Sequence, residues 1–248
     1  MPQTDKPQAT RGILLDIEGT TSSVSFVYDV MFPYVRKHLS AYLRQNWAED
    51  HLAPVLEQIA KDAGADSWRD WTAQDSSPEA RQAKVEAEIN RLMDSDIKAT
   101  GLKTLQGMIW KSGFDSGELV ADLFPDVPPA LARWKADGLD IRIYSSGSIA
   151  AQKLFFSHTH QGDLLPYFTG HYDTTIGSKK EATSFRRIAE DFALPPAEIL
   201  FVSDLIPELD AAREAGMDTR LSNRPGNHPL ESENGHTAIT SFDQISTG

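Results

Sequence analysis

The chain has 248 residues, enough for one large domain or for a core that carries an inserted domain. Its formal net charge of −12 disfavours sequence-independent binding to nucleic acid, although a local site can still be positive and accept an anionic substrate. The absence of cysteine excludes disulfides, thiolate catalysis and zinc–thiolate sites. No apolar run approaches the roughly 18 residues that span a bilayer. Residues 1–11 read as a frayed polar tail without a signal core, so we expect a cytoplasmic protein.

The first predicted element is a short apolar strand over residues 12–15, which runs directly into Asp16. Such a run suits a strand that is buried on both faces, and Asp16 then lies at its carboxyl end, where open α/β sheets bind ligands. If the extended geometry continues, the side chains of Asp16 and Glu18 project to the same side, and Gly19 permits a tight turn. Two converging carboxylates need a shared proton or a cation such as Mg²⁺. The alternative is a strand that runs into a solvated acidic turn.

About a hundred residues after this strand have helical periodicity without β-like alternation. Pro33 either begins or kinks a helix within the first stripe, and Ser77 followed by Pro78 is typical of a helix start. We interpret this block as an all-helical insertion between the first and second strands, and assign it to a cap domain of residues 21–124. Apolar stripes predict helices near 26–43, 52–59, 76–93 and 102–109.

The second half of the chain alternates between strand-like and helical segments. This alternation predicts βαβ units, and hence an α/β fold with a Rossmann-like, mostly parallel sheet as its core. We assign residues 1–20 and 125–248 to this core. Strands are expected at 139–145, at 199–202 and at 219–221, with a short segment of unassigned type near 167–172; helices are expected at 128–137, 149–156, around 185–192 and at 207–215.

Polar residues stand at comparable places in this pattern. Asp16 and Glu18 follow one strand, Ser145 ends a second, Asp204 ends a third, and Lys179 lies in a loop before a helix. Carboxyl ends of parallel strands share one edge, so these residues can meet there. Three carboxylates suffice for Mg²⁺, and a hydroxyl, helix-start amides and a lysine suffice for a phosphate, which together predict phosphoryl transfer.

Taken singly, each of these residues has a simpler interpretation. Ser145 would form a turn or helix cap, Lys179 would be a solvated surface lysine, and Asp204 would be a charge at a helix N-terminus. The occurrence of all of them in this order along the chain favours the site.

The ordered set resembles the haloacid dehalogenase superfamily, which uses an aspartate nucleophile to form an aspartyl-phosphate. That superfamily usually carries a second aspartate two residues after the nucleophile, where this chain has Glu18. With this departure, the chain is similar to the acireductone synthase family, the bifunctional enolase-phosphatases of methionine salvage. The resemblance extends from Gly12 to the last strand and rests also on Tyr144-Ser145-Ser146-Gly147-Ser148, Gln152-Lys153-Leu154 and Arg224-Pro225-Gly226-Asn227.

The resemblance implies roles for individual residues. Asp16 is expected to be the nucleophile and a metal ligand, with Glu18 at the acid/base and metal position, where that superfamily often ligates through the backbone carbonyl. Asp204 would complete the Mg²⁺ shell, and Glu208 would be an outer or water-mediated ligand. The phosphate would be held by Ser145, Ser146 and Lys179.

The reaction that the resemblance implies is enolisation of 2,3-diketo-5-methylthiopentyl 1-phosphate followed by loss of phosphate, in a monomer whose cap closes over the substrate and excludes water. Either Glu18 or a cap residue would remove the carbon-bound proton. Another phosphatase, a mutase or a dehalogenase remains an alternative within the enzymes, and a non-catalytic binding protein remains one outside them. Four aromatic residues either line a pocket for the methylthio end or form the cap interior: Phe26, Tyr28, Phe32 and Trp110.

Overall fold

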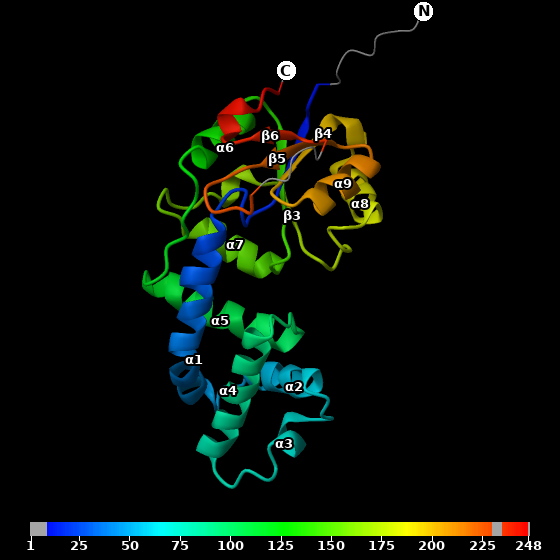
Figure 1. Cartoon of the computed structure of the whole chain (residues 1–248). Helices are drawn as coiled ribbons and strands as arrows, with labels where there is room; N and C mark the ends of the chain where they lie inside the picture. The colour runs from blue at the N-terminus through cyan, green and yellow to red at the C-terminus, as the bar shows by residue number, and fades with distance from the viewer. Residues whose placement is uncertain (1–8, 230–234, 248) are drawn as a thin grey trace, which may run out of the picture. The chain divides into compact units, whose positions relative to one another are not determined.

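The computed structural model describes residues 9–229 and 235–247. The tail expected at residues 1–11 therefore falls largely outside the described residues. The chain divides into two compact units, one formed by Met1–Val27 with Val120–Gly248 and the other by Tyr28–Leu119 (Figure 1). The second unit lies inside the range 21–124 that we assigned to a helical insertion.

The first unit is built on one parallel sheet, and this confirms the predicted fold class. In the described residues the strand order is β3-β2-β1-β4-β5-β6, and every neighbouring pair is parallel. The sequence did not predict β6, because three residues are too short to carry a period. The strands are β1 Gly12–Leu15, β2 Asp140–Tyr144, β3 Gly170–Tyr172, β4 Ile199–Ser203, β5 Asp218–Ser222 and β6 Thr237–Ile239.

Helices cover the sheet on both sides, which explains why its central strands are continuously apolar. The four residues of β1 and the five of β4 are all buried. Helices α8 and α9 pack on the face that carries Leu14 and Phe201, and Figure 1 shows α6 on the other side of the sheet. The helices of this unit are α6 Val127–Ala136, α7 Ile149–Ser157, α8 Ala182–Phe192 and α9 Ile206–Glu214.

Strand order places a topological switch point beside β1. The chain passes from β1 to β2 on one side, whereas β4 lies on the other, and ligands bind outside the carboxyl ends at such a point. The backbone N–H of Asp16 donates to the carbonyl of Val202 over 3.0 Å, so the segment after β1 stays beside β4. Residues that follow β1, β2 and β4 therefore share one edge of the sheet.

All residues of the second unit, Tyr28–Leu119, are described, and its secondary structure consists of helices without strands. A π-helical turn, Phe26–Met31, precedes α1, which begins at Phe32 with Pro33 in its first turn. Ser77 caps α4, where its hydroxyl accepts the N–H of Ala80 over 3.2 Å, as the Ser-Pro signal predicted. The helices are α1 Phe32–Asn46, α2 Ala53–Asp62, α3 Trp68–Trp71, α4 Pro78–Asp94 and α5 Thr100–Ser116; of these, α3 was not predicted.

Apolar stripes from α1, α2, α4 and α5 form the core of this unit, with Val35, Ile59, Ile89 and Leu105 fully buried. Trp110 packs against that core and donates its indole N–H to the carbonyl of Met31 over 2.9 Å. In the described part of the chain, none of the helices combines the length and the apolar character needed to cross a membrane.

The aromatic residues considered for a methylthio pocket divide between the two units. Phe32 lies between Tyr28 and Trp110, with ring centroids 5.6 and 6.2 Å away, and Tyr28 is half exposed. Phe26 belongs to the sheet unit, where its ring meets Phe155 edge-on at 6.0 Å.

Candidate active site

A buried lysine shared by two carboxylates is the centre of the site. The ammonium nitrogen of Lys179 lies 2.7 Å from Oδ1 of Asp16 and 2.7 Å from Oε2 of Glu208, and all three residues are buried. Burial alone would lower the pKa of Lys179, but the charges of Asp16 and Glu208 outweigh it and raise that pKa. Lys179 is therefore a cation at neutral pH, and it offsets part of the negative charge beside β1.

The loop before α8 positions this lysine. The hydroxyl of Tyr144 donates to the carbonyl of Gly177 over 3.0 Å, and the hydroxyl of Ser184 donates to the carbonyl of Ser178 over 2.8 Å. The Lys179 ammonium also lies 5.6 Å from the centre of the Tyr144 ring, within reach of a cation–π interaction. These contacts explain why Lys179 is buried, against the simpler expectation of a solvated surface lysine.

Asp16, Asp204 and Glu208 together carry more negative charge than the single ammonium of Lys179 balances. Burial, together with the nearby charges of Asp16 and Glu208, raises the pKa of Asp204 to about 7, against the opposing effect of Lys179. Burial and Asp16 likewise raise the pKa of Glu208, although Ser203 donates its hydroxyl to Oε2 of Glu208 over 2.9 Å. Such a cluster would be stabilised by a further cation.

The backbone around Glu18 differs from the strand-based expectation. The backbone N–H groups of Thr20, Thr21 and Ser22 all donate to the carbonyl of Ile17, so the chain turns directly after Asp16. The extended geometry from which we predicted that Asp16 and Glu18 converge therefore ends at this turn, and their convergence stays a prediction. Glu18 still contributes to the negative charge that raises the pKa of Asp204.

The oxygen atoms at this edge suit a hard divalent cation. Across residues 9–229 and 235–247, no three acidic or histidine side chains are arranged to hold a metal ion by themselves. The carboxylates of Asp16 and Asp204 are oxygen donors of the kind that Mg²⁺ and similar cations prefer. The excess of negative charge in this cluster fits such an ion.

The predicted phosphate-binding serines follow β2, the neighbour of β1. The N–H of Ser145 donates to the carbonyl of Tyr172 over 3.1 Å, and its hydroxyl accepts the N–H of Gly147 over 3.3 Å. Buried Gln152 on α7 donates its amide to the carbonyl of Gly147 over 2.8 Å and fixes the same loop. Ser146 is exposed. The loop thus presents a hydroxyl and backbone amides just before the start of α7.

Glu208 has a larger place in the site than the sequence indicated. We assigned it an outer role, yet it is buried and contacts both Lys179 and Ser203. Its position four residues after Asp204 was the available signal. Arg224 and Asn227 belong to the quoted motif but received no role, although both contact the loop after Asp16.

Comparisons with known proteins show the family of this chain. A family model described as haloacid dehalogenase-like hydrolase matches residues 10–216. Enolase-phosphatase E1 of Stenotrophomonas maltophilia is 44% identical over 239 residues, which cover 95% of this chain and 98% of that protein. Enolase-phosphatase E1 of Pseudomonas aeruginosa is 45% identical over 238 residues, or 95% and 97% of the two chains. The chain belongs to the haloacid dehalogenase-like hydrolase family, in its enolase-phosphatase E1 branch.

Two solved structures have a similar fold. The UTR4 protein of Saccharomyces cerevisiae is similar with a TM-score of 0.79 and 31% identity, covering 95% of this chain and all of that one. CbbY of Rhodobacter sphaeroides, at 14% identity and a TM-score of 0.57, shares the fold. The predicted family and the prediction of a phosphatase enzyme are confirmed. Phosphatases of this family are generally dependent on a divalent metal ion.

Gly19 brings the turn after Asp16 against Asp204, and this contact generates a prediction. Its φ is +69°, and a Cβ at Gly19 would lie 2.3 Å from Oδ2 of Asp204. An alanine in the left-handed region costs about 1 to 2 kcal/mol. We expect Gly19→Ala to lower the free energy of unfolding by more than this amount and to reduce phosphatase activity strongly. Urea titration and phosphate release measure the two effects.

Gly138→Ala is the matched control, because Gly138 has a φ of +80° but nothing lies within 4 Å of its Cβ position. It should show only the backbone effect, with full activity. Equal losses of stability and equal activity in the two variants would contradict the close approach of Gly19 to Asp204.

Proposed function

We propose that this chain is a Mg²⁺-dependent acireductone synthase. It would convert 2,3-diketo-5-methylthiopentyl 1-phosphate to 1,2-dihydroxy-3-keto-5-methylthiopentene and phosphate in methionine salvage. The observation that carries the proposal is the buried contact of Lys179 with Asp16 and Glu208, in a chain 44% identical to an enolase-phosphatase E1 over 95% of its length.

Asp16 is the proposed nucleophile. After enolisation of the substrate, one carboxylate oxygen of Asp16 attacks phosphorus, and the bond between phosphorus and the ester oxygen of the substrate breaks. The product of this step is an aspartyl-phosphate and the enol. Water then attacks phosphorus, which releases inorganic phosphate and restores the Asp16 carboxylate. The buried position of Asp16 at the carboxyl end of β1 supports this role.

Glu18 takes the acid/base position in this proposal. It gives a proton to the leaving oxygen in the first step and receives one from the attacking water in the second. Its charge acts on Asp204, which supports a location close to the reacting groups. Glu18 and residues of the helical unit Tyr28–Leu119 are both candidates for removing the carbon-bound proton during enolisation.

Lys179, Ser145 and Ser146 are the proposed phosphate-binding residues. A lysine ammonium has three N–H donors, of which Asp16 and Glu208 use two, so one remains for a phosphate oxygen. The hydroxyl of Ser145 and the amides of its loop add neutral donors. For the helical unit we propose the role of a cap that excludes water from the reacting phosphate.

Asp16, Asp204 and the main-chain carbonyl of Glu18 are the proposed Mg²⁺ ligands, with Glu208 outside them. When bound, the ion supplies charge stabilisation to the phosphoryl group and to a developing enolate oxygen. The unbalanced negative charge around Asp204 supports this assignment, because a phosphorylated substrate brings more negative charge to the same place.

We further propose that the enzyme works as a cytoplasmic monomer on a small metabolite and without nucleic acid. The net charge of −12 supports the last point. The second candidate function is hydrolysis of another small phosphorylated metabolite, with the same Asp16 as the nucleophile. Phosphate release from a panel of small phosphomonoesters distinguishes the two candidates.

The first prediction from this proposal concerns Asp16. With the diketo phosphate and Mg²⁺, the wild-type chain should form the enol and release phosphate, whereas Asp16→Asn should release phosphate more than about a thousandfold more slowly because the nucleophile is lost. Enol absorbance and free phosphate are followed together in one assay. Asp137→Asn, an equal charge change at an exposed residue, is the control. Undiminished phosphate release by Asp16→Asn would refute the proposal.

The second prediction concerns the metal. Millimolar Mg²⁺ should raise the melting temperature of the metal-free wild-type chain, since a ligand that binds only the folded state stabilises it. Asp204→Asn should abolish most of this shift, and Asp137→Asn should retain it. Scanning calorimetry with and without Mg²⁺ makes the measurement. Equal shifts in all three proteins would exclude Asp204 as a ligand.

A further inference from the structure

A segment two hundred residues away holds the turn that follows Asp16. The carbonyl of Gly19 accepts the hydroxyl of Ser222 over 3.0 Å and the amide of Asn227 over 2.8 Å. The carbonyl of Thr20 accepts Nε of Arg224 over 3.3 Å. Three side chains from β5 and the loop after it therefore hold two consecutive carbonyls of this turn.

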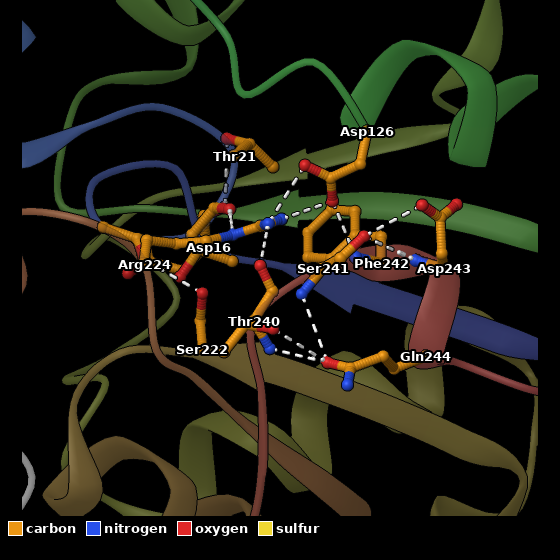
Figure 2. Close-up of polar contacts among 12 residues, drawn as sticks. Asp16, Thr21, Asp126, Ser222, Arg224, Thr240, Ser241, Phe242, Asp243 and Gln244 are labelled. Atoms are coloured by element: carbon orange, nitrogen blue, oxygen red, sulfur yellow. Dashed lines mark hydrogen bonds and ion pairs between the residues drawn. The ribbon is translucent and has the colours of Figure 1, made fainter.

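Arg224 is buried, with only 5% of its surface exposed, and its guanidinium group has contacts on every side. Its terminal nitrogens form a bidentate pair with Asp126 at 3.0 and 2.8 Å, and one of them also donates to the carbonyl of Thr240 over 2.8 Å (Figure 2). The rings of Phe124 and Phe242 lie 4.7 Å from its guanidinium carbon. A planar guanidinium fork fills this environment, and a lysine would not.

The end of the chain completes this support. Asp126 accepts the N–H of Phe242 over 2.6 Å, and the side chain of Gln244 accepts the N–H of Thr240 over 2.7 Å (Figure 2). The carbonyl of Thr240, which accepts a hydrogen bond from Arg224, is thus held in place by the turn Phe242–Gln244. Each of the three guanidinium nitrogens of Arg224 therefore has a hydrogen-bond acceptor. The acceptor of Nε is the carbonyl of Thr20, in the turn after Asp16.

We propose that Arg224, fixed by Asp126, is a positioning residue that sets the turn over Gly19 and Thr20 and thereby the Asp16 carboxylate relative to Asp204. This inference rests on the proposed nucleophilic role of Asp16. The Gly19 position leaves no room for a Cβ beside Asp204, so a small shift of the turn changes the spacing of the two carboxylates. A misplacement of about 1 Å reduces turnover by up to roughly a hundredfold in other enzymes.

The connection to Asp16 runs through the turn itself. The hydroxyl of Thr21 lies within hydrogen-bond distance of the carbonyls of Asp16 and Ile17, at 3.3 and 3.2 Å. The carbonyl of Thr21 accepts the N–H of Phe124 over 3.0 Å, and Phe124 contacts Arg224. Arg224 therefore acts on two adjacent residues of the turn, on Thr20 directly and on Thr21 through Phe124, and Thr21 contacts the carbonyl of Asp16.

Arg142 supplies a matched control. It is also largely buried, it pairs with Asp140 at 2.8 Å and Asp191 at 2.7 Å, and its guanidinium carbon lies 4.1 Å from the Phe192 ring centre. Asp140 begins β2 and Arg142 is its central residue, which lies beside Leu14 and not beside the turn after Asp16. Arg142→Lys therefore removes a comparable guanidinium fork without touching the turn.

The experiment compares Arg224→Lys, Asp126→Asn, Arg142→Lys and Asp16→Asn in metal-replete enzyme, with any phosphomonoester that the wild-type chain hydrolyses. For Arg224→Lys and Asp126→Asn we expect kcat to fall by roughly ten- to a hundredfold while KM stays within about threefold, because positioning acts on the chemical step. Arg142→Lys should lower the melting temperature with kcat within about twofold of wild type.

An Arg224→Lys variant that loses melting temperature as Arg142→Lys does, with kcat unchanged, would overturn the inference, as would equal falls of kcat in both. If Arg224→Lys does not fold, Ser222→Ala removes only one hydroxyl from Gly19 and should lower kcat severalfold; an unchanged kcat there also overturns it. Equal turnover by Asp16→Asn and wild type would instead overturn the proposed function, so the two failures are distinguishable.

Discussion

The site depends on one buried ammonium group. Lys179 lies 2.7 Å from carboxylate oxygens of both Asp16 and Glu208, and without it these charges would be buried close together without a compensating protein cation among the contacts described for them. Uncompensated charges inside a protein are expensive, and they neutralise or destabilise the fold. One lysine is still fewer than the carboxylates that surround it, which is why the same cluster also suits a divalent ion.

The fold delivers these charges to one place through strand order. β1 and β4 are neighbours although 183 residues separate Ile199 from Asp16, so Asp16 and Asp204 emerge side by side at the switch point. The turn between them is kept in place by Gly19, which has no Cβ, and by side chains that hold its carbonyls. Charge compensation and turn geometry are thus separate requirements, met by different parts of the sheet unit.

Local sequence was sufficient where local physics decides. The strand before Asp16, the Ser77 cap and the βαβ alternation were predicted because apolar periodicity and capping residues act within a few positions. The turn after Ile17 was not predicted, because three amides converge on the Ile17 carbonyl and end the extended geometry, a choice that periodicity does not encode. The burial of Lys179 and the contact of Arg224 with Thr20 come from segments far apart in sequence, and no local pattern announces them.

The most direct test of the central role of Lys179 is the free energy of unfolding of Lys179→Met in metal-free buffer, measured by urea titration beside Lys180→Met, which alters an exposed neighbour. The account predicts a loss of about 3 to 5 kcal/mol for Lys179→Met, of which Lys179→Met combined with Glu208→Gln regains a substantial part because one unpaired carboxylate is gone. A Lys179→Met protein within about 0.5 kcal/mol of Lys180→Met would contradict it.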